Sequence, residues 1–205
     1  KQAKREYIDE ITKILISMGI SDIDRVLSAY PHQLSGGMKQ RVLIAMAFFC
    51  DPTVLIADEP TTALDATIAA QVIAMFKELA VKSSVSMVYI THDIALLSEI
   101  SQRIAVMYAG EVVELGDTER IVKEPVHPYT NALLKALPSA SKDRLSTIPG
   151  RVPDFLEIGG GCRFYARCEH ASERCMKNSP EFVEVESGHW VRCFTYSNQF
   201  SAEEI

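Results

Sequence analysis

The sequence predicts an α/β fold built on a parallel sheet, followed by a small cysteine-rich region. Two short apolar runs, Val54 to Ala57 and Val85 to Ile90, are typical of strands buried on both faces of a sheet. A long segment of helical composition, Leu64 to Ala80, lies between them, and the order strand, helix, strand implies parallel pairing. Four of the five cysteines fall in the last quarter of the chain, which sets that region apart.

The remaining regular elements extend the α/β pattern on both sides. Apolar residues recur at helical spacing from Ala3 to Met18, and Met38 to Phe49 has the composition of a buried helix. After the second strand, Arg103 to Tyr108 and Glu111 to Leu115 resemble a closing hairpin, and Asp117 to Lys123 returns to helix. The α/β pattern stops there.

The C-terminal third is punctuated by prolines and cysteines. Five prolines, Gly150 and a serine-rich stretch between Pro125 and Pro153 mark a linker, interrupted by a short helix from Tyr129 to Leu137. We place a domain boundary near Pro138. The expected parts are residues 1–52, 53–124, 125–153 and 154–205, the last of them a small irregular module.

Charge and hydropathy exclude some classes of protein. The 205 residues carry 21 lysines and arginines against 27 acids, a formal net charge of -6, and no basic block, so we expect no nucleic-acid partner. The longest strongly apolar run, Val42 to Cys50, is about half of the roughly 20 residues that span a membrane, so membrane association would be peripheral. The chain begins with Lys1, and we expect the true N-terminus to lie upstream.

The segment Leu34 to Arg41, Leu-Ser-Gly-Gly-Met-Lys-Gln-Arg, opens a predicted helix. Free backbone N–H groups and the positive end of the helix dipole favour an anion there, and two glycines let the backbone approach a phosphate closely. Ser35 would cap the helix and could donate its hydroxyl to a phosphate oxygen. A plain helix cap is the alternative interpretation.

A second motif brings two acids to a strand end. Asp58 and Glu59 follow the strand Val54 to Ala57, at the edge where open α/β sheets place their ligands. In phosphoryl transfer one carboxylate holds Mg²⁺ and its waters, while another group orients or deprotonates the attacking water. Asp58 suits the first role and Glu59 the second, although Asp-Glu-Pro also occurs in ordinary loops.

A histidine follows the second strand. Thr91-His92-Asp93 comes directly after Val85 to Ile90, so parallel strands would bring His92 to the same sheet edge as Glu59. There it could contact a γ-phosphate and hold the attacking water together with Glu59. A histidine in this place without such company would be structural.

Together these motifs resemble the second half of an ABC-type ATPase, which has a P-loop NTPase fold. Leu34 to Arg41 resembles the ABC signature, Val54 to Pro60 the Walker B strand with its catalytic glutamate, Ala63-Leu64-Asp65 the D-loop, and His92 the switch histidine. The resemblance implies that Glu59 and His92 are catalytic and that Asp58 holds Mg²⁺ through water. It implies ATP contacts by Ser35, Gly36, Gly37, Met38 and Asp65. It assigns residues 1–52 to the helical signature subdomain and 53–124 to the remainder of a RecA-like core.

Further segments resemble one subfamily. Tyr30-Pro31-His32-Gln33 with Met38 resembles peptide-importer subunits, and His127-Pro128-Tyr129-Thr130 with Ile148-Pro149-Gly150 resembles the C-terminal extension of oligopeptide, dipeptide and nickel importers. The resemblance implies a peripheral subunit on the cytoplasmic face of the cell membrane. Its partners would be a second ATPase subunit, identical or different, transmembrane permease subunits and, indirectly, an extracytoplasmic peptide-binding protein. Nickel or another small solute is the alternative cargo.

One expected motif is missing from the sequence. The phosphate-binding pattern G-x-x-x-x-G-K-[ST] needs a Gly-Lys pair, and none of the ten glycines is followed by lysine. We therefore expect that these residues alone do not hydrolyse ATP, although their signature could complete a neighbouring subunit's site. A sheet that lacks its P-loop strand would also have an exposed edge.

The cysteine cluster suggests a metal centre. Cys162, Cys168, Cys175 and Cys193 are separated by five, six and seventeen residues in a region too small to rely on a core alone. The resemblance supports a [4Fe–4S] cluster, because peptide-importer ATPase subunits can carry a similar cysteine set. Zn²⁺ is the alternative, although zinc prefers closer pairs, and disulfides are disfavoured in a reducing cytoplasm. His170 and His189 lie nearby, as substitute ligands or as surface and supporting residues.

Three hypotheses for function follow. The chain belongs to a transport ATPase, or it is a non-catalytic regulatory module whose metal-binding tail controls assembly, or it belongs to a chromosome-maintenance ATPase that shares the same motifs. The third would need a long heptad coiled coil and a basic surface, and the sequence has neither.

Overall fold

A computed structural model describes residues 2–62, 66–137, 147–154 and 158–200. They divide into two compact units, Lys1–His92 and Asp93–Ile205. Each unit has its own hydrophobic core. This division falls after the second strand. The boundary expected near Pro138 lies outside the described residues and stays a prediction.

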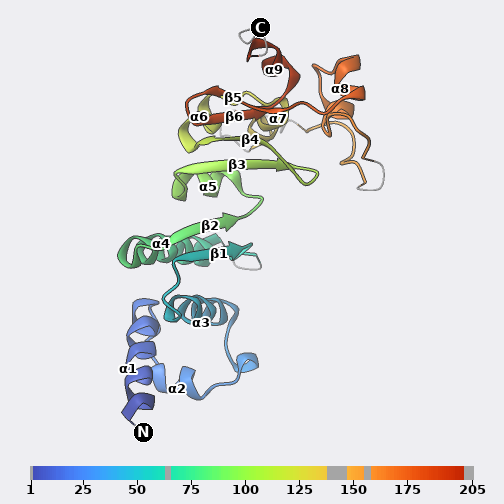
Figure 1. The fold of residues 1–205 in the computed structure, drawn as a ribbon. Helices are drawn as coiled ribbons and strands as arrows, with labels where there is room; N and C mark the ends of the chain where they lie inside the picture. Colours follow the sequence, from blue (N-terminus) through green and yellow to red (C-terminus); the bar gives the residue numbers. More distant parts are fainter. Residues whose placement is uncertain (1, 63–65, 138–146, 155–157, 201–205) are drawn as a thin grey trace. The chain divides into compact units, whose positions relative to one another are not determined.

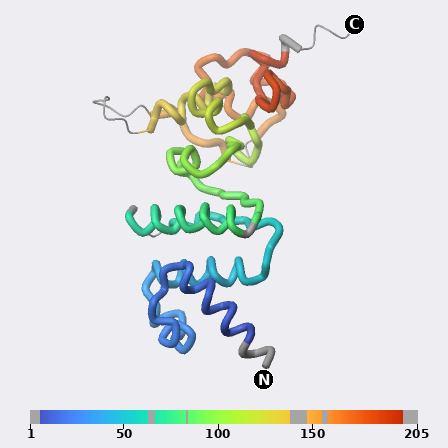
Figure 2. Tube along the Cα trace, turned by 90° about the vertical axis from the view of Figure 1, so that its left-hand side faces the viewer, coloured from blue at the N-terminus to red at the C-terminus, as the bar shows by residue number. Residues whose placement is uncertain are grey.

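The first unit contains helices and a two-stranded parallel sheet (Figure 1). Its elements are α1 (Gln2–Ser17), α2 (Ile23–Ser28), the 3₁₀ turn η1 (Pro31–Gln33), α3 (Gly36–Phe49), β1 (Val54–Asp58), α4 (Ala66–Ser83) and β2 (Ser86–Ile90). Helix α1 ends where Gly19 adopts the left-handed conformation, with φ +70°, and α1 then lies against α3 (Figures 1 and 2). The strand, helix, strand prediction is confirmed.

The sheet of the first unit has one covered face and one open face. Leu55 and Ala57 of β1, with Met87 and Tyr89 of β2, pack into the core with residues of α3 and α4. The alternating apolar residues on the other face remain 47 to 66% exposed: Val54, Ile56, Val88 and Ile90. The prediction that both faces are buried is therefore wrong for the described residues, because helices cover only one of them.

The second unit is organised around a four-stranded antiparallel sheet with the order β3-β4-β6-β5. Its strands are β3 (Arg103–Tyr108), β4 (Glu111–Asp117), β5 (Phe182–Glu186) and β6 (His189–Arg192), and its helices are α5 (Ile94–Ile100), α6 (Thr118–Lys123), α7 (Pro128–Lys135), η3 (Tyr165–Arg167), α8 (Glu173–Lys177) and α9 (Phe194–Phe200). The predicted hairpin turns at Ala109 and Gly110, which both have positive φ.

The tail is more regular than we expected. Strand β6 pairs with β4, with Glu114 opposite Val191 and Leu115 opposite Trp190, so residues from the expected irregular module complete the sheet begun by the β3–β4 hairpin. Val191 is fully buried there. Burial of such residues against β4 explains why this part of the tail forms strands and not a separate loop-rich module.

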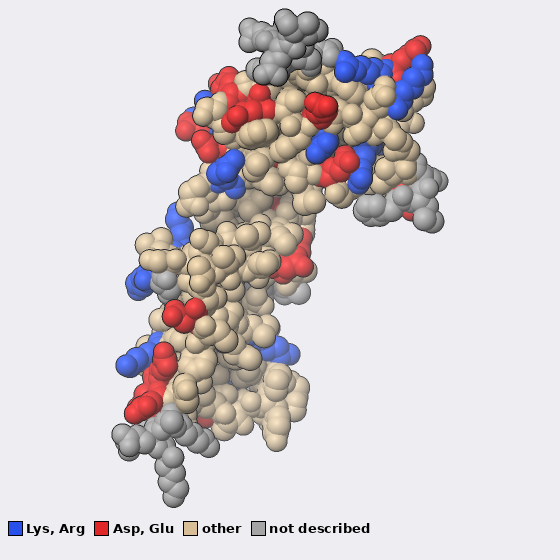
Figure 3. Space-filling view, viewed as in Figure 1, with Lys and Arg blue, Asp and Glu red and all other residues tan. Residues whose placement is uncertain are grey.

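The surface carries charges of both signs. On the face that Figure 3 shows, acidic and basic side chains are interspersed. No helix among the described ranges is long and apolar enough to cross a membrane.

Candidate functional site

The first candidate site lies where the two parallel strands of the first unit end. Asp58 is paired with Ile90 in the register of β1 and β2, so the residues that follow each strand emerge at the same edge. Glu59 Oε1 and His92 Nδ1 lie 2.9 Å apart. The sequence therefore predicted correctly that these two side chains meet, and the parallel register is the reason.

The backbone holds Glu59 in an unusual conformation. Its φ is +46°, a left-handed value that is costly for a residue with a side chain. The Glu59 N–H donates to the carbonyl of Ile90 at 2.9 Å, and the N–H of Thr62 donates to the carbonyl of Glu59 at 3.1 Å. These bonds tie the turn after β1 to the end of β2, and they aim the carboxylate toward His92.

Hydrogen bonds also set the charge of Glu59. The hydroxyl of Thr62 donates to Glu59 Oε2 at 2.7 Å, and this bond, followed by the contact with His92, holds the pKa of Glu59 below its usual value. The Glu59 side chain is 38% exposed and that of His92 84% exposed. The site is thus an ionised acceptor beside an imidazole, open to solvent and to a ligand.

The roles of two other residues predicted at this edge, Asp58 and Asp65, are not tested by the structure. Asp58, the last residue of β1, is exposed. Asp65 falls in residues 63–65, outside the described part of the chain. The proposed roles of both in Mg²⁺ and ATP binding stay predictions.

The signature segment forms the start of α3. Ser35 caps the helix, and its Oγ accepts from the N–H of Met38 at 3.3 Å. A side chain on Gly36 would meet open space, whereas a Cβ on Gly37 would lie 3.3 Å from Ile68 of α4. Gly36 therefore leaves the helix start accessible, and Gly37 leaves room for the side chain of Ile68.

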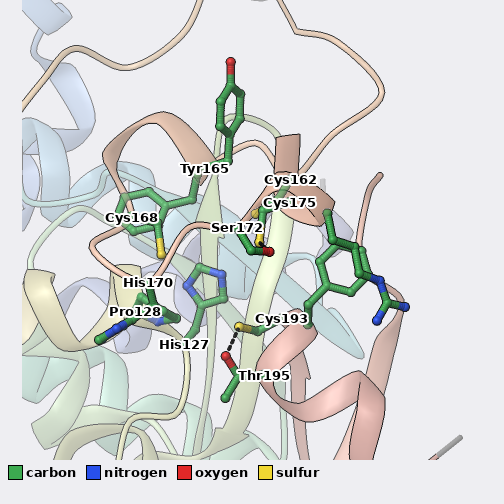
Figure 4. Close-up of a pocket in the computed structure, with 13 residues that line it drawn as sticks. His127, Pro128, Cys162, Tyr165, Cys168, His170, Ser172, Cys175, Cys193 and Thr195 are labelled. Carbon is green, nitrogen blue, oxygen red and sulfur yellow. Dashed lines mark hydrogen bonds between the residues drawn. The ribbon is translucent and has the colours of Figure 1, made fainter. Parts of the chain in front are cut away.

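The second candidate site is a cavity of about 240 Å³ in the second unit. Cys162, Cys168, Cys175 and Cys193 all line it, together with His127 and His170 (Figure 4). In the described residues, no group of three or more His, Cys, Asp or Glu side chains is arranged so that it could hold a metal ion. The structure brings the four predicted cysteines to one cavity, and the [4Fe–4S] cluster itself stays a prediction.

Backbone contacts bring two of these cysteines together. The N–H of Cys162 donates to the carbonyl of Cys175 at 2.7 Å. A Cβ on Gly161 would meet the Cys175 oxygen at 2.6 Å and would also collide with the Met176 backbone. Burial raises the pKa of the Cys162 thiol to about 11 and also raises that of Cys168. Only glycine at position 161 permits this approach.

Two arginines fasten the Cys162–Cys168 segment to the rest of its unit. Arg163 donates to the carbonyl of Ala109 in the β3–β4 turn and pairs with Glu111 at 3.1 Å. Arg167 donates to Tyr108 Oη at 3.2 Å and to the carbonyls of Ile148 and Pro149 at 3.0 and 2.8 Å. The first two cysteines are therefore held by the hairpin.

The sequence analysis missed a buried polar cluster beside this cavity. Glu114, in the middle of β4, is fully buried and accepts from His189 Nε2 at 2.9 Å and from the N–H groups of Val126 and His127 at 2.9 and 3.0 Å. His127 Nδ1 in turn accepts from the N–H of Tyr129, and burial lowers the pKa of His127 to about 4. The signal in the sequence was an acid in the centre of the strand, between the apolar residues Val113 and Leu115.

This cluster also separates the two nearby histidines. His189 is engaged with Glu114 and is not among the residues that line the cavity. His170 lines the cavity and is exposed. Of the two substitute ligands that we considered, only His170 is therefore placed where it could serve.

Comparisons with known proteins match two separate regions of the chain. The family model for ABC transporters matches residues 2–62, and the model for the oligopeptide/dipeptide transporter C-terminal region matches residues 113–175. The oligopeptide transport ATP-binding protein AppD of Bacillus subtilis is 44% identical over 198 residues, which cover 96% of this chain and 60% of AppD. The dipeptide transport ATP-binding protein DppD of Escherichia coli is 50% identical over 182 residues, 88% of this chain and 56% of DppD.

A solved structure shares part of the fold. The chain is similar to cbiO1 of Clostridium perfringens, part of the ABC transporter complex cbiONQ, with a TM-score of 0.51 and 28% identity. The match covers 57% of this chain and 45% of that one. The chain spans 56 to 60% of the length of the two curated relatives.

Proposed function

Because the chain belongs to the ATP-binding proteins of oligopeptide/dipeptide ABC transporters, we propose that it supplies the signature helix and the hydrolytic edge of such a subunit. The subunit would bind and hydrolyse ATP to energise the import of oligopeptides or dipeptides. The observation that carries this proposal is the contact between Glu59 and His92 at the end of two parallel strands.

The geometry fits hydrolysis of a phosphoanhydride. Ionised Glu59 orients a water and takes its proton as the water oxygen bonds to the γ-phosphorus and the bond to the ADP oxygen breaks. When nucleotide and Mg²⁺ are bound, His92 would contact the γ-phosphate and Asp58 would hold Mg²⁺ through water. The open start of α3, with Ser35, Gly36, Gly37 and Met38, offers N–H groups to a phosphate.

The assembly follows from the family and belongs to the same proposal. The subunit pairs with a second ATPase subunit and docks on transmembrane permeases at the cytoplasmic face of the membrane. The extracytoplasmic peptide-binding protein delivers the cargo to the permeases. These 205 residues contain no G-x-x-x-x-G-K-[ST] pattern, so by themselves they should not turn over ATP.

Reconstitution tests this function. A full-length subunit that carries this sequence would be assembled with its permeases and binding protein in lipid vesicles, and ATP turnover would be measured with a dipeptide, with Ni²⁺ and with neither. We expect stimulation by the dipeptide. Stimulation by Ni²⁺ alone would mean that nickel, and not a dipeptide, is the cargo. Absence of turnover in every condition would contradict the ATPase proposal. The 205-residue chain is the inactive control.

We also propose that the four cysteines hold a [4Fe–4S] cluster. The observation that supports this proposal is that all four thiols line one cavity, since cysteine thiolates are the usual ligands of such clusters. The chain's own contribution is to hold Cys162 and Cys168 through Arg163 and Arg167. When bound, the cluster would supply a cross-link between the hairpin and the two later cysteines.

Metal analysis with matched glycine variants tests the cluster. Anaerobically purified protein should contain about four irons per chain and absorb broadly near 400 nm. Both signals should be lost in Cys175→Ser and in Gly161→Ala, whose new methyl group would push Cys162 away from Cys175. Gly160→Ala is the control, because a Cβ there meets nothing within 4 Å. One zinc per chain, or no metal in the unchanged protein, would contradict the cluster.

A further inference from the structure

One arginine of the first unit joins three helices. Arg41 lies in α3, and its Nη1 donates to the carbonyl of Met18, just after α1, at 2.5 Å. Its Nη2 donates to Gln71 Oε1 of α4 at 2.9 Å. The two bonds use different nitrogens of one planar guanidinium, a geometry that lysine cannot reproduce.

The surroundings are shaped to receive this side chain. Gly19 follows Met18 in the left-handed conformation, and a Cβ at that position would lie 2.7 Å from Arg41 Nη1. The guanidinium therefore occupies the space that a side chain would fill, at the C-terminal end of α1, where the helix dipole favours a cation.

A second contact continues the same helix interface. Gly37 precedes Arg41 by one turn of α3, and a Cβ placed on it would lie 3.3 Å from Ile68, which precedes Gln71 by one turn of α4. Helices α3 and α4 thus meet at two successive turns, once through a glycine and once through a hydrogen bond. Two neighbouring points of proximity one turn apart would restrain the orientation of α3 relative to α4.

The two helices lead to the two parts of the candidate site. Helix α3 begins at the Ser35 cap, and α4 follows the turn that contains Glu59 and Thr62. We propose that Arg41 is a positioning residue for ATP turnover, because it holds the Ser35 cap and the Glu59 edge in a fixed relation. This inference rests on the proposed ATPase function.

The experiment separates positioning from stability in the full-length subunit. Arg41→Met keeps the apolar stem but removes both donors, and Gln71→Leu removes one acceptor on an exposed helix surface that tolerates the change. Leu15→Val, at a buried core position of α1, is the control that destabilises the same unit while keeping both hydrogen bonds of the Arg41 side chain. For each variant kcat, KM for ATP and the unfolding midpoint are measured.

We expect kcat to fall about tenfold in Arg41→Met and about threefold in Gln71→Leu, with KM within about twofold, because a small misplacement of reacting groups slows chemistry more than binding. The double variant should be no slower than Arg41→Met alone. Leu15→Val should lower the midpoint but keep kcat.

Three results would overturn or redirect the inference. If Leu15→Val lowers kcat as much as Arg41→Met, the role of Arg41 is only structural. If the decreases in kcat caused by Arg41→Met and Gln71→Leu add together in the double variant, the hydrogen bond between Arg41 and Gln71 does not contribute to turnover. If the unchanged subunit has no ATP turnover, the proposed function itself fails, which is distinguishable from both.

Discussion

Two glutamate–histidine pairs in the described part of the chain have the same separation and opposite surroundings. Glu59 and His92 lie 2.9 Å apart with side chains 38% and 84% exposed, whereas Glu114 and His189 lie 2.9 Å apart with side chains 0% and 4% exposed. Glu114 accepts two backbone N–H bonds besides that of its histidine, whereas Glu59 accepts the hydroxyl of Thr62 at an open edge.

This difference in burial shows why one glutamate–histidine pair can act on a ligand and the other can serve as a structural anchor, that is, a buried pair that stabilises the fold. A carboxylate that is buried with its hydrogen bonds supplied by the fold stabilises structure, because removing it leaves buried donors unpaired. A carboxylate that keeps an exposed face can act on a ligand. Four predictions test that division of roles.

The largest expected effect is on turnover. In the full-length subunit, Glu59→Gln removes the base that orients the attacking water, so ATP turnover should fall by about a hundredfold or more. The unfolding midpoint should change only slightly, because glutamine keeps the size of the side chain and can still accept the Thr62 hydroxyl. Steady-state phosphate release and thermal unfolding measure the two quantities. Turnover within a few-fold of the unchanged subunit would mean that Glu59 is not the base.

The second expected effect is on stability and not on turnover. Glu114→Gln places an amide NH₂ among backbone N–H groups and His189, and it should lower the free energy of unfolding of the second unit by about 3–5 kcal/mol. Trp190, the single tryptophan, lies in β6 and reports on this unit in denaturant titrations. A loss below about 1 kcal/mol would show that the buried pair is not an anchor.

The third effect depends on pH. His127 titrates near 6.5 when unfolded, but burial lowers its folded pKa to about 4, so below pH 6.5 only the unfolded state gains this proton. The contribution of neutral His127 to the free energy of unfolding is therefore complete above pH 6.5 and is lost as the pH falls toward 4. Between pH 7 and 4.5 the free energy of unfolding of the metal-free protein should fall by about 2–3 kcal/mol more than that of His127→Asn. Asparagine keeps a capping oxygen at this position but does not titrate.

Denaturant titrations at both pH values, followed by Trp190 fluorescence, measure this difference. Equal losses in the unchanged protein and in His127→Asn would contradict the buried neutral state of His127.

The smallest effect is a shift in a pH profile. Thr62→Val removes the hydroxyl that holds the pKa of Glu59 low, so Glu59 should become protonated at a higher pH. The acid limb of kcat/KM for ATP should therefore move to higher pH, with little change at neutral pH. A limb that stays in place would show that protonation of another group limits turnover.

Local sequence patterns predicted the first unit well. The runs that became β1 and β2 are apolar and short, and the glycines and serine before α3 mark its start. Parallel pairing then places Glu59 and His92 together without further information. This part of the site could be predicted because strand ends in a parallel sheet share an edge.

The second unit could be predicted only in part. The pairing of β6 with β4 joins residues more than 70 positions apart, and no local periodicity specifies such a partner. Glu114 was missed for the same reason, because its donors come from the turn before α7 and from β6. The cysteines were found by spacing, but the glycine and arginines that position them became visible only in three dimensions.

The most direct test of the central claim is a single-turnover measurement on the full-length Glu59→Gln subunit. Subunits with and without the substitution would be loaded with radiolabelled ATP, separated from free nucleotide, and followed for conversion of the bound ATP to ADP. If the Glu59–His92 edge is the hydrolytic site, the variant should retain its bound ATP. The subunit without the substitution should convert its bound ATP to ADP. Conversion at equal rates in both would contradict the account.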